Sequence, residues 1–229
     1  MRSGWSALRW WALSYLASNL ASAVVVSVTG HADDEVASIP IWVTFVGALV
    51  LWSVQVYLFP LRVNPYLFQP IRRIREWFTA RDFLRFIPLG IAGQLFLVNI
   101  VNWPLSKIWP DTFSFDEVSQ RANDITSTAP GLWAIVLVVI VVIGAPVIEE
   151  IVYRGTLQPA LESVAGRNGA LLLTAALFAA IHLEPVELPG LFAFALVLGV
   201  VRQRTGRLGP AVITHMAFNS AGLVLVALT

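Results

Sequence analysis

The chain has 229 residues, of which 57% are hydrophobic and only 13% are charged, and its formal net charge is +1. Soluble globular domains carry about 25% charged residues, so the composition argues against a water-soluble domain and indicates a protein surrounded by lipid. The sequence contains no cysteine, which excludes disulfides, thiolate metal sites and a cysteine nucleophile.

Long apolar runs separated by short polar segments recur along the whole chain. A helix that crosses the hydrocarbon core of a bilayer needs about 20 mostly apolar residues. Seven runs are candidates, at residues 10–28, 39–59, 86–101, 131 to about 162, 169–183, 190–201 and 210–228. The first is long for a signal peptide and has Trp10 and Trp11 at its edge, so we interpret it as a retained helix. The prediction is an all-α, polytopic transmembrane bundle that forms one domain over residues 1–229.

The distribution of charge between the connecting segments predicts the orientation. Arginines gather at the N-terminus, after the second run and in two later turns: Arg2, Arg9, Arg62, Arg72, Arg73, Arg75, Arg81, Arg85, Arg167, Arg202, Arg204 and Arg207. Acidic residues gather in the alternate segments: Asp33, Asp34, Glu35, Asp111, Asp116, Glu117, Asp124, Glu184 and Glu187. The positive-inside rule therefore predicts a cytoplasmic N-terminus and an external C-terminus.

One basic segment, at residues 70–86, also has apolar residues at helical spacing, namely Ile71, Ile74, Trp77 and Phe78. It is either an amphipathic helix on the membrane surface or a solvated connector that sets the topology. Almost all the basic residues of this chain are arginines, and Lys107 is its one lysine. That usage indicates a GC-rich bacterial source, and hence a multi-pass protein of the bacterial plasma membrane.

Ionisable residues inside the C-terminal apolar runs are candidates for function. A charge at bilayer depth costs at least ~2.5 to 3.5 kcal/mol, so it is rarely present for packing alone. Glu150 and Arg154 are four residues apart, and this spacing predicts an ion pair on one helical face. Glu149 points about 100° away and has no local partner, as suits a general base. The alternative, that both glutamates reach water at a helix end, is disfavoured because the helical pattern continues beyond Arg154.

Two histidines and an asparagine complete the candidate site. If the fourth and fifth runs form a hairpin that turns near 165–166, Glu149 and His182 lie equally far from the turn and face each other at one level. His215 and Asn219 are four residues apart in the last run and project from one helical face. A structural role, in hydrogen bonds between helices, is the alternative for these side chains.

Three short motifs now carry a family resemblance. Residues 149–154 read E-E-I-V-Y-R, residues 178–182 read F-A-A-I-H, and residues 215–219 read H-M-A-F-N. In this order they resemble the E-E-x-x-x-R, F-x-x-x-H and H-x-x-x-N motifs of the CPBP family, the CAAX-protease and bacteriocin-processing membrane enzymes also called the Abi family. The resemblance covers roughly residues 146–219.

The resemblance implies an intramembrane glutamic-type endopeptidase. Glu149 with His182 would activate a water molecule, while His215 and Asn219 would stabilise the oxyanion. Glu150 and Arg154 would support the site. It implies a peptide or protein substrate associated with the membrane, a lipid bilayer as the surroundings, no nucleic acid and no cofactor.

Two alternatives remain open at this stage. Glu149, His182 and His215 could be zinc ligands, because a carboxylate, two imidazoles and a water form a known catalytic zinc set. A non-enzymatic scaffold or transporter could also use intramembrane Glu, Arg and His residues as a proton relay or structural network. Transporters often have repeated halves, and none is evident here.

Overall fold

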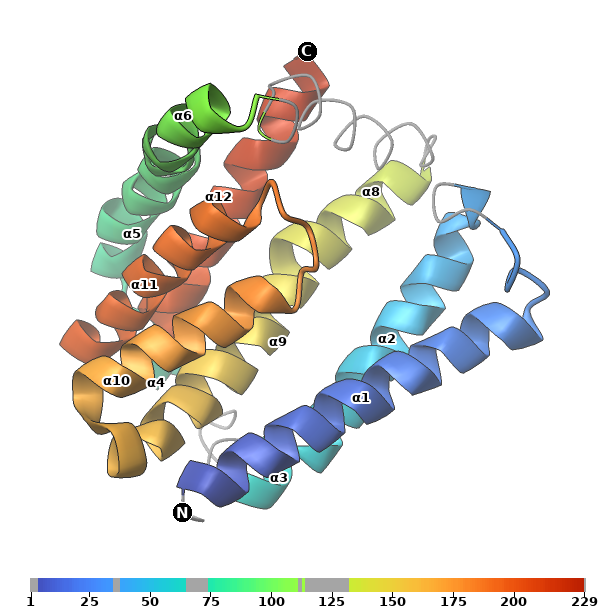
Figure 1. Ribbon diagram of the computed structural model, residues 1–229, viewed down its shortest axis with the longest axis horizontal. Helices are drawn as coiled ribbons and strands as arrows, with labels where there is room; N and C mark the ends of the chain where they lie inside the picture. Colours follow the sequence, from blue (N-terminus) through green and yellow to red (C-terminus); the bar gives the residue numbers. More distant parts are fainter. Residues whose placement is uncertain (1–3, 35–37, 65–73, 111–112, 114–131, 229) are drawn as a thin grey trace.

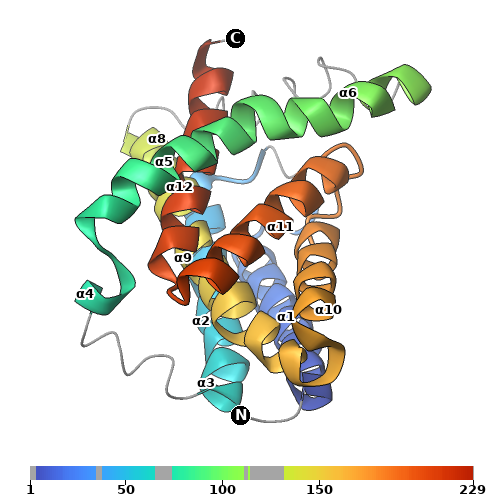
Figure 2. The ribbon, with the colours of Figure 1, turned by 90° about the vertical axis from the view of Figure 1, so that its left-hand side faces the viewer.

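The computed structural model describes residues 4–34, 38–64, 74–110, 113 and 132–228, and every regular element in these ranges is a helix. The helices form an elongated bundle in which α1 begins at one end and α12 finishes at the other (Figures 1 and 2). The predicted all-α class is therefore confirmed for the described part of the chain. A chain that passes through a bundle an odd number of times starts and finishes at opposite ends, as the start of α1 and the end of α12 do here.

The two N-terminal helices lie side by side. They are α1 (Gly4–Val28) and α2 (Ile41–Leu58), and the single turn α3 (Pro60–Val63) follows α2. The buried residues of α1 recur every three or four positions, so they lie on one face: Gly4, Ala7, Trp11, Ser14 and Ser18. This face also packs against α10, where a Cβ on Gly4 would lie 2.8 Å from the Ala160 carbonyl oxygen.

A second helical path runs from α5 (Ala80–Ala92) through the π-helical segment η3 (Gly93–Leu97) to α6 (Val98–Ile108). It begins with a capping box, in which the Thr79 amide donates to Asp82 at 2.7 Å. The helix is thus longer at both ends than the span predicted at 86–101. The predicted amphipathic segment at 70–86 is divided, because α4 (Ile74–Trp77) is one turn and Ala80 starts a new helix. Residues 70–73 lie outside the described residues.

The next stretch carries two π-helical segments around a short α-helix. It consists of α8 (Leu132–Val138), η4 (Val139–Gly144), α9 (Ala145–Val152), η5 (Tyr153–Leu157) and α10 (Gln158–Ala180). Each π segment is followed by a proline, Pro146 or Pro159, in the first turn of the next helix. A proline has no N–H, so a carbonyl one turn earlier loses its donor and the local hydrogen-bond register widens.

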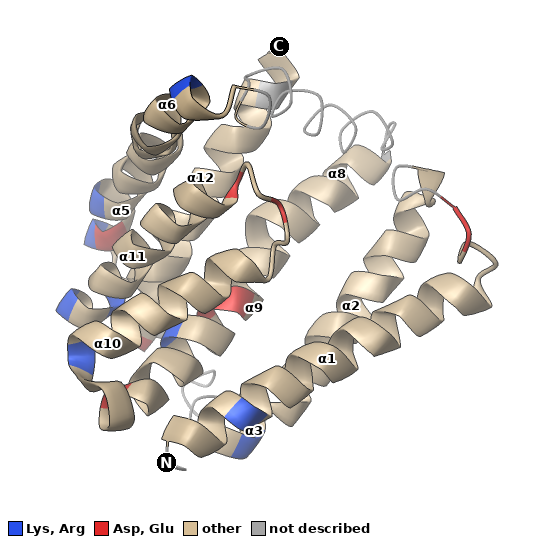
Figure 3. Cartoon of the chain, in the orientation of Figure 1, with Lys and Arg blue, Asp and Glu red and all other residues tan. Residues whose placement is uncertain are grey.

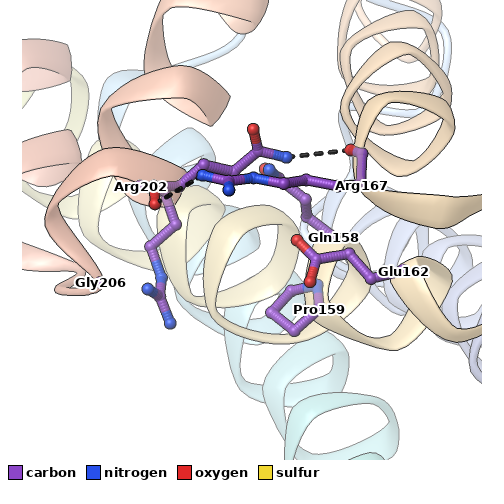
Figure 4. A pocket seen from close by; sticks show the side chains of 7 residues that line it. Gln158, Pro159, Glu162, Arg167, Arg202 and Gly206 are labelled. Atoms are coloured by element: carbon purple, nitrogen blue, oxygen red, sulfur yellow. Dashed lines mark hydrogen bonds between the residues drawn. The ribbon is translucent and has the colours of Figure 1, made fainter.

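The chain reverses inside α10 at Gly166, which has φ 67° and ψ 173°. This conformation is essentially restricted to glycine. The rings of Tyr153 and Phe178, thirteen residues before and twelve after Gly166, lie 5.2 Å apart between centroids. The predicted hairpin near 165–166 is therefore present. Arg167 and Gln203 tie its turn to α11 by two reciprocal side-chain to backbone hydrogen bonds, drawn in Figure 4.

The last two helices are α11 (Leu188–Thr205) and α12 (Gly209–Leu228), joined by a tight turn in which Gly206 has φ 67°. α12 packs against α5 at a point where no side chain fits between the backbones. A Cβ on Gly90 would lie 2.2 Å from the Thr214 carbonyl oxygen. The catalytic candidates on α12 are thus held against α5 as well as against α9 and α11.

Four helical stretches in the described residues are long and apolar enough to cross a membrane: Gly4–Val28, Ile41–Val63, Ala80–Ile108 and Trp133–Ala180. The count of seven predicted spans is not confirmed. The fourth stretch contains two predicted spans, because it includes the Gly166 reversal. α11 falls outside the four, and it finishes in a polar turn with Arg202 and Arg204.

Basic residues gather on the half of the bundle that holds the start of α1, α3 and the turn between α11 and α12 (Figure 3). A basic residue at the end of α6, Lys107, lies at the opposite end. The acidic residues between α10 and α11 lie away from the basic half. The bundle therefore has one arginine-rich end, as expected of a membrane protein that obeys the positive-inside rule.

Candidate active site

Glu150 joins two helices that are far apart in the sequence. Its Oε1 accepts one hydrogen bond from Arg154 Nη1 and another from His215 Nδ1, each at 3.0 Å. Glu150 and Arg154 have no exposed side-chain surface, and His215 is only 5% exposed. The predicted pairing of Glu150 with Arg154 is present, and the same carboxylate also links α9 to α12.

Arg154 connects this pair to two further elements. Its Nη2 donates to the carbonyl oxygen of Ala195 in α11 at 3.0 Å, and its guanidinium lies 4.6 Å from the centroid of the Phe178 ring. A buried charge is tolerated only when it is paired and hydrogen-bonded. Arg154 meets that condition by contacting α9, α10 and α11 at once, so it fixes their relative positions around the site.

The two adjacent glutamates differ sharply in their surroundings. Glu149 is 23% exposed, whereas Glu150 is fully buried, and Glu149 Oε2 lies 3.8 Å from His215 Nε2. An ionised carboxylate can only accept hydrogen bonds, so Nδ1 of His215 carries the proton donated to Glu150. In the neutral ring, Nε2 then has a lone pair directed toward Glu149. The imidazole is held between a buried carboxylate and a partly exposed one.

His182 lies just beyond the C-terminus of α10. Its Nδ1 is 2.8 Å from the Phe178 carbonyl oxygen, which can only accept, so Nε2 of the neutral ring is unprotonated and can act as a base. The Phe178 ring lies 5.1 Å from the His182 ring and 5.8 Å from the His215 ring, between centroids. The two histidines thus flank one phenylalanine, and no hydrogen bond joins His182 to Glu149 or His215 in the described structure.

Asn219 lies one turn after His215 and binds the π-helical segment before α9. Its Nδ2 donates to the Val141 carbonyl oxygen at 2.8 Å. The Ala145 N–H donates to the carbonyl oxygen of Ile140, five residues earlier, which is the spacing of a π-helix. In the same pattern, the carbonyl oxygen of Val141 would accept from the N–H of residue 146, which is Pro146. Because proline has none, Asn219 supplies the missing donor. One of its two amide hydrogens is therefore used, and the other remains for a ligand.

A contact from α1 to the candidate site was not predicted from the sequence. The Tyr15 hydroxyl donates to the carbonyl oxygen of Ile181, the residue before His182, at 3.2 Å. Trp11, one turn earlier, stacks on Tyr15 and meets the Tyr153 ring edge-on. The last carbonyls of a helix have no partner within the helix, so Tyr15 caps α10 from another element. A tyrosine within an apolar run was the available signal, since its hydroxyl needs a partner in lipid.

A second feature that was not predicted from the sequence is the ion pair between Arg207 and Asp82 at the arginine-rich end. Arg207, in the turn between α11 and α12, donates to both carboxylate oxygens of Asp82 at 2.6 and 2.8 Å. Its Nη1 also contacts the Trp77 carbonyl oxygen at 3.4 Å. Gly209 packs directly against the same carbonyl, so a side chain there would collide with it. This bidentate pair holds the start of α12, and hence His215, against α5.

The alternative zinc set does not converge in the structure. Within the described ranges, no group of three His, Asp or Glu side chains is arranged to hold a metal ion. Glu149, His182 and His215 therefore do not fit a zinc centre in this arrangement, and we derive no chemical step through a metal.

The comparison with known protein families concerns the segment that carries these side chains. A family model described as "Type II CAAX prenyl endopeptidase Rce1-like" matches residues 131–221. These residues are similar to an Rce1-like domain. No curated protein and no solved structure matched the chain.

The Rce1-like domain agrees with the resemblance to the CPBP family, and its limits enclose all three motifs. It spans from the start of α8 to the middle of α12, so all the candidate side chains lie inside it. Tyr15 and Asp82, which hold the domain from α1 and α5, lie outside the matched residues. The described chain has helices long and apolar enough to cross a membrane, and the segment that carries its motifs is similar to a protease family. The N-terminal helices add supporting contacts to that segment.

Proposed function

We propose that this protein is an intramembrane endopeptidase that hydrolyses peptide bonds by direct attack of water. The observation that carries the proposal is the chain of contacts from Arg154 through Glu150 and His215 to Glu149, buried at one end and partly exposed at the other. A partly exposed carboxylate beside a fixed imidazole is a suitable arrangement for deprotonating water. The match to an endopeptidase family over residues 131–221 supports the same reaction.

In the proposed reaction, Glu149 accepts a proton from water, and His182, with its free Nε2, assists. The water oxygen forms a bond to the carbonyl carbon, and the carbonyl π electrons move to the oxygen. When the tetrahedral intermediate collapses, the C–N bond breaks and the proton held by Glu149 passes to the leaving amine. The products are a carboxylic acid and an amine, and transfer of the acid's proton to the amine gives a carboxylate and an ammonium. The reaction needs no nucleophilic serine or cysteine.

His215 and Asn219 are proposed to stabilise the oxyanion. The second amide hydrogen of Asn219 is available for this role. With Nδ1 bonded to Glu150, His215 donates from Nε2 to the oxyanion when both ring nitrogens carry protons. Loss of one such donor typically lowers the rate by about 10²- to 10³-fold.

The proposed substrate is a peptide or protein that is itself associated with the membrane. Glu149, Glu150 and Arg154 lie on a helical stretch long and apolar enough to cross a bilayer, so the scissile bond has to reach them from within or beside the lipid. The name of the matched family, which specifies an endopeptidase, supports a peptide or protein substrate.

The experiment that tests the proposal compares membrane-associated peptides between cells that produce the wild-type chain and cells that produce Glu149→Ala. A substrate should accumulate uncleaved in the variant, with its cleaved form present only in the wild type. The purified protein, reconstituted in liposomes, should then cleave that substrate, and prior dialysis against a strong chelator should leave the rate unchanged. Activity that is lost on chelation and restored by one zinc ion per chain would replace this mechanism with a metal-dependent one.

A further inference from the structure

A cavity of about 270 Å³ lies at the arginine-rich end of the bundle, between the first part of α10, its hairpin turn and the end of α11 (Figure 4). It is smaller than the ~300 to 1,000 Å³ typical of pockets for drug-sized ligands. Polar side chains dominate its walls: Gln158, Glu162, Arg167, Arg202 and Gln203. None of them belongs to the candidate active site.

Glu162 contributes an exposed acceptor to this cavity. It forms no ion pair within the described residues, although its charge attracts Arg202. Gln158, a second polar residue of the wall, is only 1% exposed, and its Nε2 donates to the Gly199 carbonyl oxygen at 3.3 Å. Its Oε1 is buried and has no hydrogen-bond partner in the structure. Of the two side chains, the Glu162 carboxylate is the one that a cationic donor can reach.

Donors line the opposite wall. The Nε of Arg202 is buried and also has no hydrogen-bond partner. Arg167 Nη2 donates to the Gln203 carbonyl oxygen at 3.0 Å, and Gln203 Nε2 donates back to the Arg167 carbonyl oxygen at 2.9 Å. These reciprocal bonds hold the Arg167 guanidinium in place at the rim. A buried polar atom without a partner is uncommon in native proteins, and here two such atoms belong to residues that line one cavity.

We propose that this cavity binds the headgroup of a phospholipid that carries both a phosphate and a primary ammonium, of the phosphatidylethanolamine type. The phosphate contacts Arg202 and Arg167, and the ammonium donates to the Glu162 carboxylate. A quaternary ammonium, as in phosphatidylcholine, has no N–H to donate. A purely anionic headgroup would place its charge near Glu162.

The position of the cavity supports a lipid rather than a soluble ligand. It lies beside the hairpin turn at the end of two long apolar segments, where phospholipid headgroups meet a membrane helix. The lipid would bridge α10 and α11, the two helices that Arg154 joins from the other side through Ala195. This inference does not depend on the proposed proteolysis, because binding is measured without a substrate.

The test is lipid binding by the full-length protein, measured by native mass spectrometry and in nanodiscs of phosphatidylethanolamine, phosphatidylcholine or phosphatidylglycerol. Wild-type protein should retain phosphatidylethanolamine at least about tenfold better than phosphatidylcholine. A tenfold difference in affinity corresponds to the binding free energy of about one charge-assisted hydrogen bond. Arg202→Gln should lose this binding. Arg204→Gln, an exposed arginine two residues along the same helix, is the matched control and should retain it.

A second variant keeps the test valid if Arg202→Gln is poorly folded. Glu162→Gln changes an exposed side chain, so the fold should persist, and it should specifically reduce the preference for the primary ammonium over the quaternary one. Equal retention of all three lipids by the wild type would overturn the proposal. So would identical lipid profiles for Arg202→Gln and Arg204→Gln, because either outcome would mean that the cavity does not select this headgroup.

Discussion

At the scale of single residues, Glu149 and Glu150 are neighbours with opposite surroundings. Glu150 is fully buried and accepts from both Arg154 and His215, while Glu149 keeps 23% of its surface and approaches only His215 Nε2. A group already engaged in two hydrogen bonds is poorly placed to take a proton from water. We therefore propose the less engaged carboxylate as the general base and the buried one as the group that orients the imidazole.

The first prediction separates these two roles by substitution. Glu149→Gln should abolish cleavage and leave the free energy of unfolding close to that of the wild type. Glu150→Gln should lower both activity and stability, the latter by about 3 to 5 kcal/mol, because it leaves Arg154 buried without its counter-charge. Denaturant unfolding in detergent, run beside a cleavage assay, measures both quantities. Full activity of Glu149→Gln would remove this residue from the mechanism.

The second prediction concerns the tyrosine that caps the helix of His182. Tyr15→Phe removes only the hydroxyl that donates to Ile181, so His182 should be less well positioned. The net worth of such a hydrogen bond is about 0.5 to 1.5 kcal/mol, so kcat should fall by up to about tenfold while KM stays the same. Tyr57→Phe, at an exposed tyrosine of α2, is the control and should have no effect. A fall in stability with unchanged kcat would show a purely structural role.

At the scale of the elements, the site depends on how closely helices approach one another. α5 and α12 touch backbone to backbone at Gly90, and the turn before α12 is tied to α5 by the Asp82–Arg207 pair. The π-helical segment η4 is held to α12 by the bond from Asn219 to Val141. These contacts position His215 and Asn219 from two sides, so the elements outside the Rce1-like domain contribute to its geometry.

The third prediction tests the close approach of α5 to α12. Gly90→Ala adds a Cβ at 2.2 Å from the Thr214 carbonyl oxygen, which forces the helices apart. Overpacking of this kind costs about 1 to 3 kcal/mol, so thermal unfolding should begin at a lower temperature and activity should fall. The control is Gly222→Ala on α12, where the nearest heavy atom to the new Cβ is 3.5 Å away. Equal stability of the two variants would mean that the helices separate without cost.

At the scale of the whole molecule, the distribution of charge implies how the bundle is oriented in a membrane. The described basic residues lie mostly on the half that holds the start of α1 and the turn between α11 and α12 (Figure 3). That half also contains the cavity proposed to hold a lipid headgroup. From the positive-inside rule we propose that this half faces the cytoplasm.

The fourth prediction tests that orientation with single introduced cysteines, which is feasible because the chain has none of its own. Cysteines at Asn168 and Arg204 should react with a membrane-impermeant thiol reagent only from the cytoplasmic side. Cysteines at Asp34 and Glu187 should react only from outside. Permeabilised cells, in which all four positions should react, provide the control. Labelling of Asn168 and Arg204 from opposite sides would be incompatible with the hairpin at Gly166.

The sequence by itself determined the features that depend on local spacing. Composition was enough for the membrane class, and the separation of four residues between Glu150 and Arg154 was enough for their ion pair, because a helix brings such positions onto one face. The hairpin at Gly166 was also predictable, because a glycine lies where two apolar runs meet. The order of the three motifs was sufficient for the family resemblance.

Only the tertiary structure decided which of these side chains meet. His215 contacts Glu150 across 65 residues, and Asn219 reaches a carbonyl 78 residues away that Pro146 leaves without a donor. Two π-helical segments change the helical register on either side of α9, so a regular 3.6-residue period could not specify the direction of each side chain. The physical reason is that spacing fixes a face within one helix, whereas the rotation of helices against one another is set by packing.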